Sequence, residues 1–409
     1  MEKNIGHPNK LCRREFLKLL ASAGLFAGCG RVPTGNTAPP ASLALVGGAL
    51  IDGTGADPLS NATVLIRDGR IAAVGQTVQP PADAQAIDVQ GATILPGFIN
   101  AHVHDAYDEA NLEAWARAGV TTVRDMGNGG TPRDLFAFRD RVRAAPRCAR
   151  LVAVGPIVTA PGGYPIAPWG GSGLTVTSPE DARQKVGRLL DNGADMVKIA
   201  LESGTIFRQR IPTLFPEVAA AIAAVARERG VRLTCHVTAR QELEIALDVG
   251  ANDLAHMILT NLSAALIDRA IEADVYWTPT LELWKCVSED NAVSFDRVAI
   301  SNLQSFVEAG GKVALGTDYG GYTTRLGIGM PLPELEMMQE AGMTPMQIVV
   351  AATQHAAHVC GLEREVGTLK VDRAADILVV HGDPLADIHA LADVKLVLRD
   401  GEVIRQQRS

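Results

Sequence analysis

The chain has 409 residues, of which 47% are hydrophobic and 21% are charged, and its formal net charge at pH 7 is −8. This length and composition indicate a globular, enzyme-sized protein and exclude an intrinsically disordered one. The excess of acidic residues argues against a nucleic-acid partner, because such a protein normally presents a basic face.

The first 29 residues have the pattern of an export signal. Two consecutive arginines precede a short apolar run and resemble a twin-arginine signal, although Cys12 stands where Ser or Thr is usual. The run ends at Cys29 in a sequence that resembles a bacterial lipoprotein cleavage box, with Phe26 atypical at its position. We therefore expect an exported protein, periplasmic or anchored to the membrane only through a lipid on Cys29. An uncleaved anchor and a soluble product cut elsewhere are the alternatives.

Residues 30–41 are rich in Pro, Thr and Gly and are predicted to be a linker. After this linker no run of eighteen apolar residues occurs, so no transmembrane span is expected in the mature protein. Four of the six cysteines lie outside the signal, widely spaced and without a C-x-x-C pair, so no disulfide framework is expected. These four are Cys148, Cys235, Cys286 and Cys360.

Both ends of the mature chain are rich in short strands separated by Gly and Asp turns. The N-terminal strands are expected at 43–51, 62–67, 70–74 and 85–89, and the C-terminal ones at 376–380, 395–399 and 402–405. Asp400 and Gly401 have the pattern of a hairpin turn between the last two. We expect residues 42–97 and 363–409 to pair into one small β-sandwich domain.

Residues 98–362 alternate between β-like and helical patterns. Eight apolar β-like runs are centred near Ala101, Thr121, Leu151, Met196, Leu233, Leu254, Val275 and Val313. Amphipathic helical stretches, such as 217–229 and 241–249, separate most of them. A unit of about 30 residues is the size of one βα step, so we predict an α/β fold of the (β/α)₈ TIM-barrel type. This periodicity alone leaves an open doubly wound sheet as an alternative.

The first expected barrel strand ends in a His-x-His pair, His102 and His104. Because side chains at i and i+2 share one face of a strand, both imidazoles point to the same side and can hold one metal ion. By itself such a pair is a weak signal, since many are merely two histidines on a polar face.

Further residues of the types that bind metals are expected at the ends of later barrel strands. They are Lys198, His236, His256 and Asp318. The carboxyl ends of all barrel strands meet at one rim, so these side chains are predicted to converge with the His-x-His pair. Taken singly, each has an ordinary interpretation as a buried histidine or a lysine that extends to solvent. Six together favour a metal site.

The order His-x-His, Lys, His, His, Asp resembles the binuclear-metal branch of the amidohydrolase superfamily. The resemblance runs from the strand expected at 43–50, through residues 353–357, to a segment at 367–376 that is similar to the family's return into the sandwich. Residues 193–198 resemble the branch whose lysine becomes carboxylated, which includes imidazolonepropionase-related and Xaa-Pro dipeptidase-like exported peptidases.

This resemblance implies two divalent metal ions. It assigns the first ion to His102, His104 and Asp318 and the second to His236 and His256, with Lys198 bridging them. An ammonium has no lone pair, so the lysine can bind metal only after CO₂ converts it into a carbamate with one oxygen for each ion. Imidazole-rich ligand sets favour zinc, with Mn²⁺, Co²⁺ and Fe²⁺ as alternatives.

The implied activity is hydrolysis of an amide C–N bond by a metal-bridging hydroxide, with Asp318 as general base and then acid. We expect a small-molecule substrate, either a dipeptide or an N-acyl amino acid. Tyr164, in the long Gly/Pro-rich loop 159–170, is a candidate to bind the polarised carbonyl, and Arg208 and Arg210 are candidates to hold a substrate carboxylate. The alternative for each of these residues is a place in a solvent-exposed surface loop without a functional role.

Two other functions are left open by the sequence. The same fold with one metal could open a cyclic amide or deaminate a ring, and the number of bound ions distinguishes this possibility. A lipoprotein that binds a ligand without catalysis would show no metal-dependent turnover. A structural protein with scattered histidines is the remaining alternative, and the sequence does not decide whether the chain forms a homo-oligomer.

Overall fold

The structure is a computed structural model that describes residues 42–407. The predicted export signal, Cys29 and the linker therefore lie outside the described residues. Among the helices of the described part, none is long and apolar enough to span a membrane. The four cysteines that it covers are free and buried, in agreement with the expected absence of a disulfide framework.

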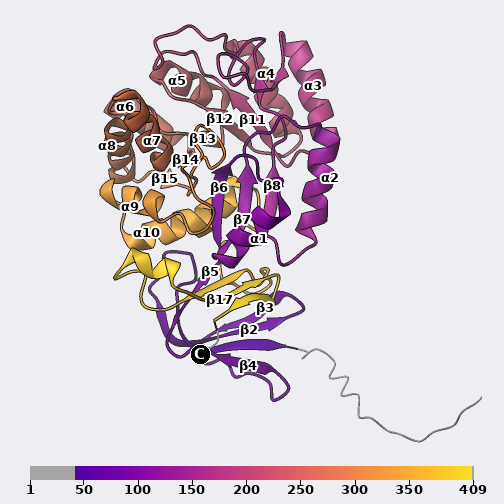
Figure 1. Ribbon diagram of the computed structural model, residues 1–409, viewed down its shortest axis with the longest axis vertical. Helices are drawn as coiled ribbons and strands as arrows, with labels where there is room; N and C mark the ends of the chain where they lie inside the picture. The colour runs from indigo at the N-terminus through magenta and orange to yellow at the C-terminus, as the bar shows by residue number, and fades with distance from the viewer. Residues whose placement is uncertain (1–41, 408–409) are drawn as a thin grey trace, which may run out of the picture. The chain divides into compact units, whose positions relative to one another are not determined.

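An eight-stranded sheet combines strands from both ends of the chain (Figure 1). Its order is β18 (Glu402–Gln406), β17 (Val394–Arg399), β16 (Ile377–Val380), β5 (Thr93–Pro96), β1 (Leu43–Leu50), β2 (Leu59–Arg67) and β3 (Arg70–Gly75), with β4 (Gln85–Asp88) paired to β1. Apolar side chains of both ends share one core, for example Leu45, Ile94 and Leu396. The sheet thus places the chain ends beside each other.

One strand of this sheet, β5, was not expected from the sequence. It pairs in parallel with β1 and antiparallel with β16, and so it joins the N-terminal strands to the C-terminal ones. All four of its residues are buried, which removes the polar/apolar alternation by which a strand is recognised. The next strand begins directly after Gly97, so the chain passes from this sheet into the parallel strands.

Parallel strands form two further sheets in the middle of the chain. One has the order β6 (Phe98–Val103), β7 (Val120–Asp125) and β8 (Arg150–Ala153). The other has the order β10 (Leu174–Thr175), β9 (Val158–Thr159), β11 (Val197–Ala200), β12 (Leu233–His236), β13 (Asp253–Ala255), β14 (Tyr276–Thr278) and β15 (Lys312–Val313). Eight of these strands fall where the sequence predicts them; the two short strands β9 and β10 are additional.

Backbone hydrogen bonds connect the edges of these two sheets. Ala101 on β6 donates to the carbonyl of Leu315, just after β15, at 2.8 Å, and Asp195 donates to the carbonyl of Ala153 on β8 at 3.0 Å. Helices surround the strands in Figure 1. This arrangement is an α/β, TIM-barrel-like domain.

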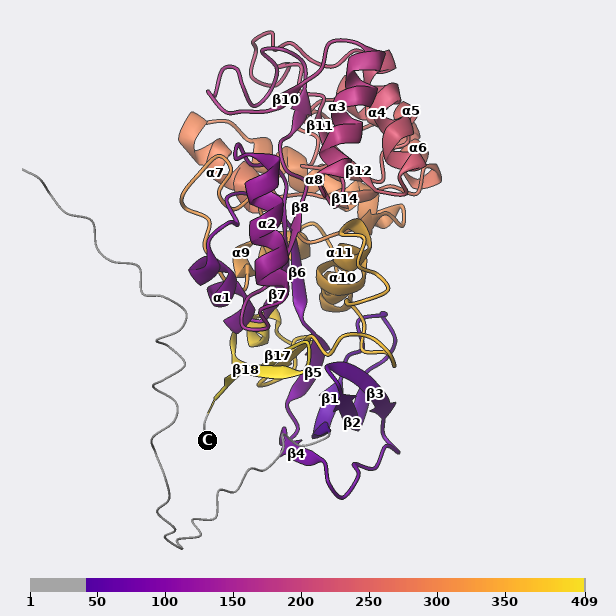
Figure 2. The ribbon, with the colours of Figure 1, turned by 90° about the vertical axis from the view of Figure 1, so that its right-hand side faces the viewer.

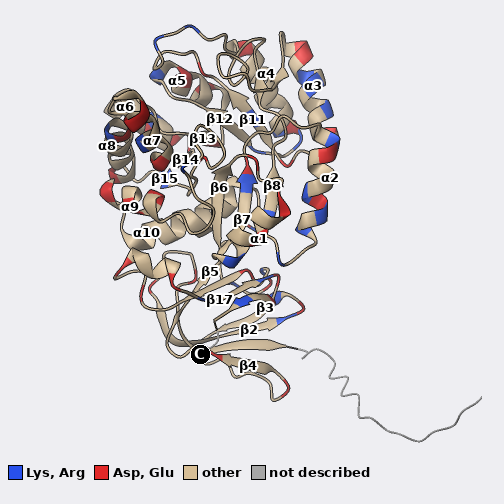
Figure 3. Ribbon diagram, in the orientation of Figure 1, with Lys and Arg blue, Asp and Glu red and all other residues tan. Residues whose placement is uncertain are grey.

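Most strands are followed by a helix that packs on the outside. The helices are α1 (Glu109–Arg117), α2 (Pro132–Arg143), α3 (Pro179–Asp191), α4 (Pro216–Glu228), α5 (Arg240–Val249), α6 (Ala264–Glu272), α7 (Leu281–Asn291), α8 (Phe295–Glu308), α9 (Leu332–Glu340), α10 (Pro345–Val350) and α11 (Ala356–Val359), with a π-helical turn η1 (Ala351–His355) and a 3₁₀ turn η2 (Ile388–Ala392). Charged residues lie along α2 and α3 (Figure 3).

Local sequence explains where several of these helices begin. The hydroxyls of Thr131 and Ser178 accept hydrogen bonds from backbone N–H groups in the first turns of α2 and α3, and a proline follows each of them. A proline at the first helical position loses no hydrogen bond there, because that N–H has no partner within the helix. These capped helix starts determine where the loops between the parallel strands and the surrounding helices end.

Candidate metal centre

The centre of the site is a contact between the His-x-His pair and Asp318. His102 lies in β6 and His104 follows it, and the Nε2 atoms of the two rings lie 3.1 and 3.2 Å from Oδ1 of Asp318. The close approach depends on Gly316, because a Cβ atom there would lie only 2.7 Å from Cβ of His102. These three side chains place potential metal-binding atoms within 4.8 Å of one another.

The two later histidines extend this group. His236 is the last residue of β12 and His256 directly follows β13. The ring of His256 lies 4.7 Å from the ring of His102 and 4.6 Å from that of His236, measured between centroids. Residues separated by more than 150 positions therefore meet, as the sequence predicted.

Lys198 is the second residue of β11 and is almost fully buried. The sequence placed it at the end of its strand, but β11 continues for two more residues, to Ala200. Burial lowers the pKa of Lys198 to about 7; the nearby Asp318 carboxylate opposes this effect and Arg124 adds to it. After burial, the positive charge of Lys198 is among the effects that lower the pKa of His102 and of His256.

Burial and mutual contacts set the charge state of the site. Burial lowers the pKa of both His102 and His256 well below its ordinary value, so these imidazoles are neutral and can donate a lone pair. Burial alone would raise the pKa of Asp318, but the two histidines beside it outweigh this and hold its pKa well below the usual range. His102 and His256 thus offer neutral nitrogen ligands and Asp318 an anionic oxygen at neutral pH. At His104, burial is outweighed by contact with Asp318, which raises the pKa of the imidazole.

The second ring nitrogens of three histidines have polar partners. Nδ1 of His104 lies 2.9 Å from the carbonyl oxygen of Gly127, and Nδ1 of His256 lies 2.9 Å from the hydroxyl of Thr280. Nε2 of His236 lies 3.5 Å from a carboxylate oxygen of Glu202. Such partners orient a metal-binding imidazole and fix its tautomer.

Several potential ligand atoms of the site are buried without a hydrogen bond. They are both ring nitrogens of His102 and Oδ1 of Asp318. Leaving a buried polar atom without a partner costs about 1–3 kcal/mol, so several such atoms at one place need an explanation. A metal ion accepts these lone pairs, and the donor set of imidazoles and a carboxylate fits a divalent transition metal.

Strained backbone accompanies the site. Asp318, His256 and Thr280 have φ angles of 65°, 72° and 52°, in the left-handed region that L-residues seldom adopt. Such conformations cost about 1–3 kcal/mol each and persist where the surrounding structure enforces them. Here they belong to two predicted metal ligands and to the hydroxyl partner of one of them.

Two buried carboxylates lie behind His236. Glu202 accepts a hydrogen bond from the Thr238 hydroxyl at 2.6 Å and from the Gly204 backbone N–H at 2.6 Å. Glu242 accepts from the N–H and the hydroxyl of Ser203 and from the N–H of Thr238. Burial would raise the pKa of Glu202, but His236 outweighs it, and the pKa is lowered. Glu202 therefore faces the site as an anion.

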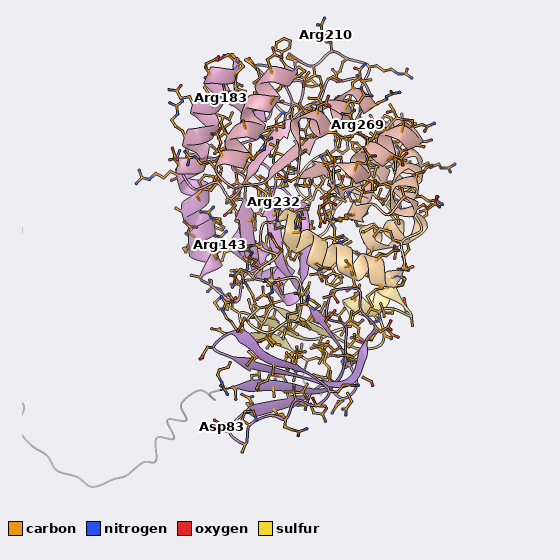
Figure 4. The ribbon with its side chains drawn as sticks, turned by 180° about the vertical axis from the view of Figure 1, so that it is seen from behind. Asp83, Arg143, Arg183, Arg210, Arg232 and Arg269 are labelled. Atoms are coloured by element: carbon orange, nitrogen blue, oxygen red, sulfur yellow. The ribbon has the colours of Figure 1, made fainter. Side chains whose placement is uncertain are left out.

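The predicted substrate residues lie in two different environments. The ring of Tyr164 stacks on that of His236, with centroids 4.2 Å apart and planes 23° apart. Arg208 and Arg210 are exposed, and no ion pair links either of them to another described residue. Figure 4 shows Arg210 at the outer edge of the molecule. The structure thus brings Tyr164 to the metal ligands and leaves Arg208 and Arg210 at the surface.

Sequence reasoning missed Glu202, Thr280 and Trp284. Trp284 packs its ring 5.7 Å from that of His256, and its buried indole N–H has no hydrogen-bond partner. Glu202 and Thr280 each lie two residues after a strand, close to the strand ends that directed attention to the histidines. Their position was therefore a usable signal, but Glu and Thr are common in loops.

Residues 93–404 match the model of the amidohydrolase family. The chain belongs to this family. The match covers most of the chain and bears out the superfamily resemblance seen in the sequence.

Two curated relatives align with this amidohydrolase along most of its length. Imidazolonepropionase of Haloarcula marismortui is 24% identical over 405 residues, which cover 88% of this chain and 94% of the relative. Ochratoxinase of Aspergillus niger is 23% identical over 402 residues, which cover 86% and 83%. A deacetylase of Agrobacterium fabrum is 42% identical, but the aligned 95 residues span only 22% of this chain and 23% of that protein.

Solved structures agree with the fold. A Xaa-Pro dipeptidase crystallised with methionine in its active site superposes with a TM-score of 0.77 at 22% identity, covering 88% of this chain and 99% of that one. A putative prolidase from Bifidobacterium longum superposes with a TM-score of 0.76 at 27% identity, covering 90% and 97%.

Proposed function

We propose that this amidohydrolase is a metal-dependent hydrolase that cleaves an amide C–N bond in a dipeptide or N-acyl amino acid. The observation that carries the proposal is the group of histidines around Asp318, in which both ring nitrogens of the buried His102 and Oδ1 of Asp318 have no hydrogen-bond partner. In the same proposal, the two parallel sheets form one (β/α)₈ barrel and the terminal strands form a β-sandwich.

The proposed ligands divide into two sets that share one bridge. His102, His104 and Asp318 would hold one divalent ion, and His236 and His256 would hold the second. Bound metal would polarise the substrate carbonyl and lower the pKa of water toward neutrality. The chain orients these ligands through the groups behind them: the Gly127 carbonyl, the Thr280 hydroxyl and the Glu202 carboxylate.

Lys198 is proposed to bridge the ions as a carbamate. The neutral amine attacks the carbon of CO₂, a C–N bond forms and an N–H proton is released. Burial favours the neutral amine, and no hydrogen bond or ion pair from another described residue engages Nζ. The support is therefore a buried amine among metal-binding groups.

Asp318 and Tyr164 are proposed to act on the substrate. Asp318, kept anionic by its two histidines, takes the proton of the attacking water and passes it to the leaving amine. Tyr164 is stacked on His236, and burial raises the pKa of its phenol, so the hydroxyl remains a hydrogen-bond donor to the carbonyl oxygen.

The substrate class is supported by the relatives. Among the similar proteins are an imidazolonepropionase and a Xaa-Pro dipeptidase, and both align with nearly the whole chain. We therefore choose an amide that adjoins a carboxylate. Arg208 and Arg210 are the proposed carboxylate contacts. Because both are exposed, this role requires either a substrate long enough to reach them or a movement of their loop toward the site.

The experiment is a screen of dipeptides and N-acyl amino acids with protein reconstituted with Zn²⁺, Mn²⁺ or Co²⁺. The expected result is metal-dependent release of an amino acid from at least one member, abolished by a chelator and restored by added metal. Turnover of cyclic amides or nucleobases alone would replace the proposal by ring opening or deamination. Ligand binding without any turnover would identify a non-catalytic protein.

A further inference from the structure

Three aromatic rings continue outward from the metal-binding group. Tyr164 stacks on His236, Trp169 meets Tyr164 edge-on at 5.2 Å, and Phe207 meets Trp169 edge-on at 5.1 Å. We name Tyr164, Trp169 and Phe207 the aromatic row. Its inner end touches a proposed metal ligand, and its outer end reaches the surface.

The row is assembled from two loops that follow neighbouring parallel strands. Tyr164 and Trp169 lie between β9 and β10, and Phe207 lies between β11 and α4. In Figure 2 these loops occupy the end of the molecule away from the terminal sheet. Because the loops at the carboxyl ends of barrel strands carry substrate contacts, the row lies where a substrate would enter.

Trp169 is the member of the row that is available to a ligand. Its side chain is 41% exposed, whereas the other two rings are partly buried. An exposed indole between two other rings presents a flat apolar surface to water, and such surfaces near a site commonly bind ligands. An aromatic group placed on Trp169 would contact it face-on or edge-on and would displace water from its surface.

Two exposed, positively charged residues follow the outer end of the row in the sequence. Arg208 follows Phe207 directly and Arg210 lies two residues further, and neither has an ion-pair partner among the residues from 42 to 407. The row therefore combines an apolar surface with nearby unpaired cations. This combination suits a molecule that has both an aromatic group and a carboxylate.

From these contacts we infer that the aromatic row is a specificity subsite, and that the substrate carries an aromatic or flat apolar group next to the scissile amide. The inference rests on the proposed function and narrows its substrate class. It assigns Trp169 and Phe207 to selectivity between substrates and leaves the chemistry to the metal-binding group.

Matched substrate pairs test this inference. One pair is N-phenylacetylglycine and N-acetylglycine, and the other is N-acetylphenylalanine and N-acetylalanine. In the parent protein, kcat/KM should be higher for the aromatic member of at least one pair. Trp169→Ala and Phe207→Ala should each lower the aromatic-to-small ratio about tenfold, since a well-packed apolar group changes selectivity by that order.

Phe215→Ala is the control, because Phe215 is 67% exposed and no ring contact connects it to the row among the described residues. This variant should leave the ratio unchanged. An equal ratio in the parent and both row variants would overturn the inference, as would an equal loss in the control.

A binding measurement separates this inference from the proposed hydrolysis. Calorimetric titration of the metal-loaded protein with phenylacetate and with acetate needs no turnover. Tighter binding of phenylacetate, lost in Trp169→Ala and kept in Phe215→Ala, would support the subsite even if no amide were hydrolysed. Equal affinity for the two acids in the parent would contradict it, even if hydrolysis were observed.

Discussion

Two buried polar clusters share the parallel strands, and they differ in how completely their atoms are hydrogen-bonded. In the first, Arg124 on β7 forms an ion pair with Asp253 at 2.8 Å and also donates to the carbonyls of Ala101 and Val359. The Thr234 hydroxyl completes this cluster by donating to Asp253 at 2.6 Å. Every charge in it has a protein partner.

The second cluster is the candidate metal-binding group, and several of its buried polar atoms have no hydrogen-bond partner. His102 has no hydrogen bond at either ring nitrogen, and Oδ1 of Asp318 has none with suitable geometry. Both clusters are buried from solvent, so the difference does not come from exposure. The first cluster is fully hydrogen-bonded within the protein, whereas the second leaves potential ligand atoms without a partner, as the proposed metal site requires.

The largest effect is expected from Asp318→Asn. The amide keeps an oxygen to bind metal but cannot accept the proton, so kcat should fall about a thousandfold while most of the metal remains bound. Steady-state rates and metal analysis of the same sample measure both quantities. The exposed Asp268 on α6 provides the matched control Asp268→Asn. A rate near that of the parent would remove Asp318 from proton transfer.

The next effect concerns the completed cluster. Arg124→Met leaves Asp253 as an unpaired buried charge and should lower the free energy of unfolding by about 3–5 kcal/mol. Adding Asp253→Leu should restore much of this loss, because the uncompensated charge is then gone. Denaturant unfolding of the metal-free proteins measures both changes.

Substitution of Lys198 by Met tests the difference between the Arg124–Asp253 cluster and the candidate metal-binding group. Lys198→Met removes a buried amine that no carboxylate pairs with directly among residues 42–407, so the metal-free protein should lose less than about 1 kcal/mol or gain stability. If Lys198→Met destabilised the metal-free protein as much as Arg124→Met, the two clusters would not differ in the way described.

A smaller effect is expected from Glu202→Gln. The amide keeps the shape of the carboxylate but loses the charge that faces His236, so metal affinity should fall about 10–100-fold. Competition with a chelator measures this affinity without any turnover. Glu217→Gln, an exposed exchange on α4, is the control. Equal affinities in the two variants would make Glu202 a purely structural residue.

A further effect depends on pH and involves Glu334. This buried carboxyl accepts hydrogen bonds from the N–H groups of Leu281 and Glu282, and burial raises its pKa to about 8. An acid whose pKa is raised in the folded state binds its proton more tightly there, so stability is lost as the pH rises from about 5 through 8. Relative to Glu334→Gln, the free energy of unfolding should fall by at most about 1.4 kcal/mol per pH unit.

Denaturant unfolding of the parent and Glu334→Gln at several pH values measures this difference. A difference that stays constant from pH 5 to 8 would mean that Glu334 does not change its protonation on unfolding in this range.

Much of the site was predictable because it follows from the periodicity of the chain. His102 and His104 are separated by one residue at the end of β6, and His236 and His256 lie at the ends of successive strands, so parallel geometry brings them together. β5 was not predictable in this way, because a strand buried on both faces has no alternation to read.

The partners behind the ligands were harder to predict from sequence. Whether Glu202 or Arg208 faces the site depends on the path of a loop, which spacing does not define. Glu202 turns inward to accept two hydrogen bonds, whereas Arg208, in the same loop, stays exposed. Strand ends were therefore more informative than loop residues, of which Tyr164 reaches the site and Arg208 does not.

The most direct test of the account is the number of metal ions bound per chain. Purified, metal-reconstituted protein should hold two divalent ions by elemental analysis, and Lys198→Ala should hold fewer than two while remaining folded by circular dichroism. Two ions held by Lys198→Ala as tightly as by the parent would contradict the bridging role. A single ion in the parent would contradict the binuclear site itself.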